Sequence, residues 1–117
     1  GKSLVAELIT HKRIIDQDKS GNRRWQLFRT AEVFVDEYEI NHEYQLDLTV
    51  RGLPVYCEDG QAEIVHEGHV VDVIQRGAER YLPYSMSSVI VRPTSAHPIV
   101  FQTWYSPLSR ERAAIQY

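Results

Sequence analysis

Three histidines and the single cysteine are the residues best suited to binding a metal ion. His66 and His69 lie three positions apart, with Glu67 between them. Because a zinc-like ion needs three or four protein ligands, His42 or Cys57 would have to complete such a site. A metal-dependent enzyme that uses His42, His66 and His69 is therefore one hypothesis. The alternative is an exposed hairpin with two surface histidines, and on that interpretation we expect no metal and no other cofactor.

Nucleophilic catalysis has less support. Cys57 would act as a nucleophile only beside a base and an orienting group, and no local Cys-His-Asn or Ser-His-Asp motif is recognisable. A small cysteine on a strand is better explained as a packed, partly buried residue. We therefore expect no catalytic residues and a chain that is not an enzyme.

Aromatic side chains with polar tips are the third group with chemical potential, because they are typical of small-molecule pockets. The alternative for each of them is ordinary core packing. In the last predicted strand, Gln102 and Trp104 lie on one face, and Phe101, Thr103 and Tyr105 lie on the other. The sequence does not determine which of these two faces points inward. The aromatic candidates are Trp25, Tyr81, Tyr84, Trp104 and Tyr105.

Short strands must position all of these residues. Apolar and polar residues alternate from Tyr44 to Val50, which is the pattern of a half-buried strand. Glu58-Asp-Gly60 predicts a tight hairpin. About eight or nine such strands, roughly ten residues apart, indicate a single all-β barrel or jelly roll. The expected strands lie within Ser3–Ile15, Arg23–Asp36, Tyr44–Val50, Val55–Cys57, Ala62–His66, Val70–Ile74, Tyr81–Tyr84, Ser88–Val91 and Ile99–Tyr105, and a short C-terminal helix is expected over Arg110–Gln116.

The bulk composition narrows the class further. The chain has 117 residues, enough for one domain, and a formal charge of −3, which argues against a broad nucleic-acid footprint. No apolar run approaches the ~20 residues that cross a bilayer, and nothing resembles a signal peptide. We therefore expect a cytoplasmic protein without a membrane partner. The leading Gly1 in place of Met indicates a piece of a longer protein.

Several of these segments together resemble the effector-binding domain of the arabinose-responsive, AraC-type transcription regulators. The match runs without a gap from about Glu32 to about Gly77, and Phe101–Tyr105 followed by Pro107 resembles a later strand of that family. It rests on Phe34-Val35-Asp36, Tyr44, Leu46-Asp-Leu-Thr-Val-Arg-Gly52, Gly60 and Gly68. The resemblance implies a cupin-like barrel that binds a small effector inside, an N-terminal arm over the ligand, and C-terminal helices that form a homodimer. It also implies that DNA is bound only by a separate C-terminal domain, which this chain does not contain.

One position departs from that family in a way that bears on the ligand. The resemblance implies an arginine directly after Asp36, where it would hold a sugar oxygen, but this chain has Glu37. Arginine offers only donors and an ionised glutamate only acceptors, so the expected ligand chemistry is inverted. Glu37 shares a parity with Val33 and Val35, which favours a place inside the barrel, whereas the alternative is a solvated carboxylate.

The sequence thus predicts the small-molecule-sensing domain of an AraC-type activator. The expected effector is urea, an amide, an amine or a sugar other than arabinose. The ligand-binding residues expected for it are Glu37, Trp25, Tyr81, Tyr84, Gln102 and Trp104. A β-sandwich interaction module without a ligand is a further alternative.

Overall fold

The computed structural model describes residues 12–48 and 52–105, which form ten strands and one short 3₁₀ helix. In chain order these are β1 (Arg13–Gln17), β2 (Arg23–Arg29), β3 (Phe34–Ile40), β4 (Tyr44–Asp47), β5 (Leu53–Asp59), β6 (Gln61–His66), β7 (His69–Gln75), β8 (Glu79–Leu82), η2 (Tyr84–Met86), β9 (Ser88–Pro93) and β10 (Ile99–Tyr105).

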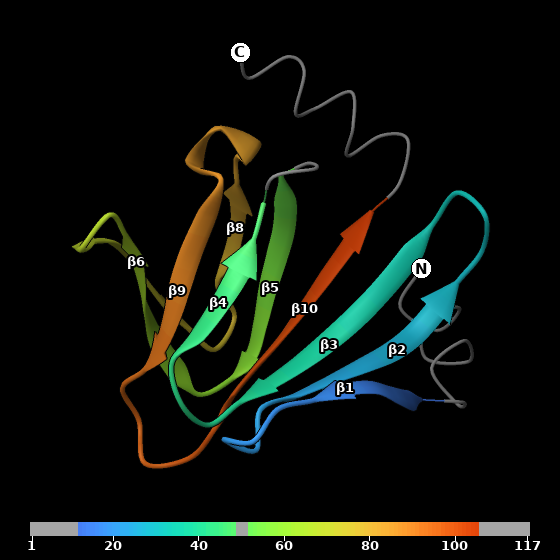
Figure 1. Ribbon diagram of the computed structural model, residues 1–117, viewed down its shortest axis with the longest axis horizontal. Coiled ribbons are helices and arrows are strands. Elements are labelled where there is room, and N and C mark those ends of the chain that lie inside the picture. The colour runs from blue at the N-terminus through green and yellow to red at the C-terminus, as the bar shows by residue number, and fades with distance from the viewer. Residues whose placement is uncertain (1–11, 49–51, 106–117) are drawn as a thin grey trace.

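The strands form two antiparallel sheets that face each other. The larger sheet has the order β1-β2-β3-β10-β5-β8, and the smaller has the order β4-β9-β6-β7. In Figure 1 the larger sheet runs from β1 at the lower right to β5 near the centre, and β4, β9 and β6 lie to its left. The all-β barrel or jelly roll predicted from the alternation is confirmed.

The apolar core lies between the two sheets. Side chains of a strand point alternately to its two faces. On β3 the inward set includes Tyr38 and Ile40, and on β10 it includes Phe101, whose ring stacks on Tyr38 with centroids 4.9 Å apart. Burial of a side chain such as Phe101 contributes roughly 1.5–3 kcal/mol. Leu46 and Val91 close the core from the smaller sheet.

The turn between β5 and β6 shows why a glycine stands at one chain reversal. Gly60 has φ +83°, and a Cβ atom there would lie 2.7 Å from the carbonyl oxygen of Pro98. Only glycine combines this backbone angle with such a close approach. The hairpin predicted at Glu58-Asp-Gly60 is therefore present, and the β9–β10 loop packs against it.

Some element boundaries differ from the sequence-based prediction. The expected strand Arg23–Asp36 is two strands, because Thr30 starts a turn in which its backbone N–H donates to the carbonyl of Val33 at 2.8 Å. The expected strand Tyr81–Tyr84 is wrong at its end, since β8 stops at Leu82 and a 3₁₀ turn follows Pro83. The predicted helix Arg110–Gln116 lies outside the described residues. Within the described part, no helix has the length and apolar character needed to span a membrane.

Candidate ligand-binding site

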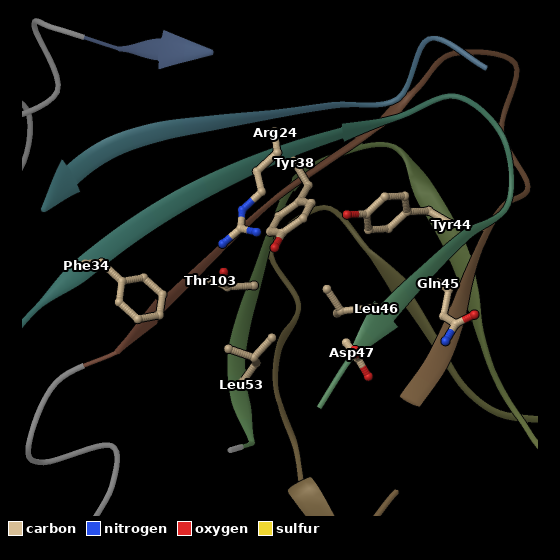
Figure 2. Close-up of a pocket in the computed structure, with 9 residues that line it drawn as sticks. All are labelled: Arg24, Phe34, Tyr38, Tyr44, Gln45, Leu46, Asp47, Leu53 and Thr103. Atoms are coloured by element: carbon tan, nitrogen blue, oxygen red, sulfur yellow. The ribbon is translucent and has the colours of Figure 1, made fainter. Parts of the chain in front are cut away.

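A cavity of about 200 Å³ opens at one end of the space between the sheets. Figure 2 shows side chains from β2, β3 and β10 of the larger sheet meeting those of β4 across this space. Its wall combines apolar side chains with a guanidinium group and several hydroxyl groups. The lining residues are Arg24, Phe34, Tyr38, Tyr44, Gln45, Leu46, Asp47, Leu53 and Thr103.

An ion pair between Arg24 and Asp36 supports one wall of the cavity. The register of β2 against β3 sets Arg24 opposite Tyr38, one pleat away from Asp36. The Nη2 and Nε groups of Arg24 both donate to Asp36 Oδ2, at 2.6 Å and 3.2 Å. Asp36 is fully buried, and its Oδ1 atom has no hydrogen-bond partner among the described residues. Burial lowers the pKa of Arg24, but the Asp36 hydrogen bond and nearby tyrosines raise it more, so the guanidinium stays charged.

The hydroxyl groups of the cavity stay protonated as well. Burial raises the pKa of Tyr38 and of Tyr44, although the charge of Arg24 works in the opposite direction. The two tyrosine rings lie 5.7 Å apart, and the Arg24 guanidinium sits 5.3 Å from the Tyr38 ring centroid. Thr103, 1% exposed, adds a third hydroxyl. A hydroxyl both donates and accepts, so this wall suits a small molecule that carries hydroxyl or carboxylate groups.

No protein-family model matches the chain, and no curated protein sequence matches it. Solved structures do match. The mannose 6-phosphate isomerase from Bacillus subtilis has a TM-score of 0.67 at 14% identity over 81% of this chain, which spans 28% of that enzyme. A cupin 2 conserved barrel domain protein from Rhodopseudomonas palustris has a TM-score of 0.65 at 12% identity, covering 83% of this chain and 71% of that one. An uncharacterized conserved protein with a double-stranded beta-helix domain from Klebsiella pneumoniae has a TM-score of 0.62 at 14% identity, with 91% and 89% covered.

The chain has a cupin fold. Sequence identities this low show that the fold is shared and nothing more. Of these three proteins one is named as an enzyme, and the other two are named only by their fold. None of these three proteins is named as a transcription regulator, so the cupin half of the predicted resemblance is confirmed and the regulator half stays a prediction.

Glu37 does not lie inside the cupin barrel. On β3 the core side carries Asp36, Tyr38 and Ile40, so Glu37 between them points to the outer face of the larger sheet. The sequence-based placement of Glu37 was therefore wrong. Its parity with Val33 and Val35 was read correctly, but both valines are only half-buried, and the fully buried residues have the other parity.

The structure nevertheless brings four predicted ligand contacts together on that outer face. Trp25 of β2 and Gln102 of β10 flank Glu37 of β3 in one cross-strand row. Gln102 Nε2 donates to Glu37 Oε1 at 3.2 Å. Trp104 lies on the same face, opposite Val35 in the neighbouring row. These four side chains therefore form an outer cluster rather than the lining of the barrel.

The two remaining predicted contacts lie elsewhere. Tyr81 pairs with Pro54 on the far side of the larger sheet, where its hydroxyl lies close to Gly52. Tyr84 belongs to the 3₁₀ turn and is 48% exposed. Neither residue lines the cavity.

Sequence reasoning missed the residues that do line the cavity with polar groups. These are Arg24, Tyr38, Tyr44, Gln45, Asp47 and Thr103, with Asp36 behind Arg24. The available signal was the alternation of Phe34, Asp36, Tyr38 and Ile40, in which a charged residue interrupts an aromatic and aliphatic stripe. A charged side chain in such a stripe is buried in the folded protein only where a partner of opposite charge compensates it.

The three histidines do not come together either. His66 and His69 pair across the β6–β7 hairpin, whereas His42 lies in the loop between β3 and β4. The strands β4 and β6 flank β9 and run in the same direction. His42 precedes β4 and His66 ends β6, so they lie at opposite ends of the sheet. The described residues contain no group of three or more His, Cys, Asp or Glu side chains that would hold a metal ion.

Cys57 is a core residue of β5. It is fully buried, and its thiol donates to the carbonyl oxygen of Asp59 at 3.4 Å. Burial raises the pKa of the thiol above its usual value, which disfavours the nucleophilic thiolate. The packed cysteine predicted from the sequence agrees with this position.

Proposed function

We propose that the chain is a small-molecule-sensing cupin domain that binds a hydroxylated, polar effector in the cavity between its sheets. The observation that carries the proposal is the ion pair of the buried Asp36 with the half-buried Arg24, at the wall of a cavity that also presents three hydroxyl groups. Burying a charged pair is costly, and it is best explained where its remaining hydrogen-bonding capacity serves a ligand.

The chemistry of the wall selects the class of effector. Arg24 has five N–H donors, of which two contact Asp36, and each hydroxyl of Tyr38, Tyr44 and Thr103 can donate or accept. Such a set pairs with adjacent hydroxyl groups or with a carboxylate. A cavity of about 200 Å³ is smaller than drug-sized sites of roughly 300–1,000 Å³, which favours a monosaccharide, polyol or hydroxy acid.

This effector class differs from the one inferred from Glu37. Urea, amides and amines were favoured because an acceptor was expected inside the barrel, and Glu37 lies outside it. The same observation removes the reason for excluding arabinose, so sugars in general belong to the proposal.

The regulatory part of the proposal rests on the sequence resemblance to AraC-type activators. On that basis the domain acts as a homodimer, and a separate domain binds DNA. Effector binding would shift the dimer between two arrangements by no more than its differential affinity for them. Light scattering of the purified chain with and without effector tests the dimer.

Calorimetric titration with monosaccharides, sugar acids, polyols, hydroxy acids, urea, amides and amines tests the binding site. Thr103→Val and Tyr38→Phe each remove one hydroxyl while conserving shape, and a lost hydrogen bond of about 1 kcal/mol predicts an affinity loss of roughly five- to tenfold. Thr94→Val on an exposed loop is the matched control and should bind like the wild type. If no hydroxylated compound binds, or if both cavity variants bind normally, the cavity is not the effector site.

Catalysis has no comparable support in the described residues. The neighbours with this fold include an enzyme, but here the candidate histidines are separated and Cys57 is buried. We therefore propose binding without turnover. Elemental analysis of the purified protein, before and after His66→Ala, tests this point, because a stoichiometric metal that the variant loses would favour a metal-dependent enzyme instead.

A further inference from the structure

The ammonium group of Lys12 lies on the outer face of the larger sheet. Lys12 Nζ lies 2.5 Å from Glu37 Oε2 and 4.6 Å from the centroid of the Trp25 ring. A cation over an indole face and against a carboxylate is held by both the ring quadrupole and the opposite charge. The arrangement is the one by which proteins recognise alkylammonium groups.

The walls of this ammonium site belong to the interior strands of the sheet. Trp25, Glu37, Gln102 and Glu58 lie on β2, β3, β10 and β5, which are consecutive neighbours. Gln102 Nε2 donates to Glu37 Oε1 at 3.2 Å and to Glu58 Oε2 at 2.5 Å, so two carboxylates converge on one amide. The side chain of Glu37 is only 11% exposed. Glu37 is therefore held by the neighbouring strand β10 as well as by Lys12.

The negative charge of the site's walls exceeds the positive charge of its occupant. One ammonium, from Lys12, faces the carboxylates of Glu37 and Glu58. Burial raises the pKa of the Glu58 carboxyl, and the nearby charge of Glu37 raises it further, while Lys12 and Gln102 oppose the shift. Without Lys12 the two carboxylates would face each other with only an amide between them, and a replacement cation would be favoured.

The occupant is the least firmly held part of the site. The Lys12 side chain is 41% exposed. It stands just before β1, the edge strand, in which all five residues are exposed and whose pairing with β2 shifts register between Ile14 and Asp16. Strands with so little buried surface open at low free-energy cost.

We propose that Trp25, Glu37, Gln102 and Glu58 form a binding site for a primary alkylammonium group, which Lys12 fills when no ligand is present. The ligand's ammonium donates to the carboxylates, and its methylene groups cover the Trp25 ring. Binding displaces Lys12 from the sheet. The alkylammonium group belongs either to a free amine or to a lysine side chain of another protein.

Chemical rescue of Lys12→Ala tests the site, with n-butylammonium chloride as the free-amine probe. The emission of Trp25 is followed in a Trp104→Phe background, since these are the two tryptophans of the chain. We expect saturable binding at least tenfold tighter than in the chain that keeps Lys12, because the tethered ammonium no longer competes. Lys12→Met, which keeps an unbranched stem of similar length without the charge, should give the same binding, so the test can still be made if Lys12→Ala folds poorly.

The controls separate recognition of the ammonium from general salt or apolar effects. n-Butanol and equimolar sodium chloride should give no saturable change, and Lys12→Ala/Glu37→Gln should lose the response to butylammonium. A response that survives Glu37→Gln, or its absence in both Lys12 variants, overturns the proposal. A lysine-containing peptide that binds more tightly than butylammonium identifies a protein lysine as the source, and the reverse order identifies a free amine.

This site is independent of the cavity between the sheets. Thr103→Val should leave the butylammonium response unchanged, because Thr103 faces the core side of β10 and Gln102 faces the other. A failed effector titration therefore says nothing against the ammonium site, and the reverse also holds.

Discussion

Two neighbouring carboxylates on β3 are held in very different ways. Asp36 points between the sheets, is fully buried and accepts two hydrogen bonds from Arg24. Glu37, the next residue, points outward and pairs with Lys12, which precedes the edge strand β1. The partner of Asp36 stands on the interior strand β2, whereas the partner of Glu37 stands just before the edge strand β1. One carboxylate thus belongs to the core, and the other belongs to a surface whose occupant is exchangeable.

The comparison predicts unequal energetic consequences. Breaking a buried pair leaves one charge without compensation, at a cost of about 3–5 kcal/mol. An ion pair between two exposed groups contributes only about 0–1 kcal/mol. The Lys12–Glu37 pair lies between these two cases, because Lys12 is 41% exposed and Glu37 only 11%. Each of the following variants tests whether the inner and outer carboxylates divide in this way.

The largest effect is expected for Asp36→Asn. Because the Arg24 side chain is 35% exposed, we expect less than the cost of a fully buried pair, about 2–3 kcal/mol of unfolding free energy. Urea denaturation measures it. Asp47→Asn, an exposed carboxylate at the cavity rim, is the control and should stay within about 0.5 kcal/mol of the wild type. Equal losses of unfolding free energy for the two variants would mean that the Arg24–Asp36 ion pair does not stabilise the fold.

A smaller effect is expected for Glu37→Gln. The neutral amide keeps the shape of the side chain but loses the attraction to Lys12. Because Lys12 is 41% exposed and Glu37 only 11%, the loss should exceed that of an exposed pair but stay below that of Asp36→Asn, at about 1–2 kcal/mol. Glu39→Gln, which breaks the exposed pair with Arg23, serves as the matched control in the same denaturation series. A loss as large as that of Asp36→Asn would contradict the division into inner and outer carboxylates.

Added salt should weaken the stabilising effect of the two ion pairs to different extents. The Debye length falls from about 10 Å at 0.1 M to about 3 Å at 1 M, and buried pairs are screened much less than exposed ones. In 1 M sodium chloride the stability difference between wild type and Glu37→Gln should shrink, because the Lys12 side chain is 41% exposed. The difference for Asp36→Asn should shrink less, because Asp36 is fully buried although Arg24 is 35% exposed. Denaturation at both salt concentrations checks this, and parallel changes in the two differences would contradict it.

The smallest effect is expected at Glu58, and it depends on pH. Burial and Glu37 raise the pKa of Glu58 above its usual 4.5. The folded state therefore holds this proton more tightly than the unfolded state. The stability that the protonated form contributes is fully present below about pH 4.5 and is lost as pH rises through the raised value. Glu58→Gln should remove this loss, so its stability relative to wild type should rise between pH 4 and 7. A flat difference would mean that Glu58 is not coupled to Glu37 in the ammonium site.

Much of the fold followed from local patterns. The alternation in Tyr44–Val50 and the turn at Glu58-Asp-Gly60 predicted strands and a hairpin, and β4, β5 and β6 lie there. Strand boundaries near Thr30 and Pro83 were less accessible, because hydrogen bonds within the turns decided them. The three candidate histidines are not all neighbours, because closeness in sequence placed only His66 and His69 together.

The amino-acid sequence by itself determined that this chain forms an all-β structure with strands of mixed polarity. It also determined that Asp36 and Glu37 lie on opposite faces, because adjacent residues of a strand always do. Only the tertiary structure decided which face is inside. That choice depends on the pairing of β3 with β10, more than fifty residues away in sequence, and on the smaller sheet covering the Tyr38 side. Alternation within one strand carries no information about such distant partners, so the sequence supplied the two carboxylates and the packing of the sheets assigned their roles.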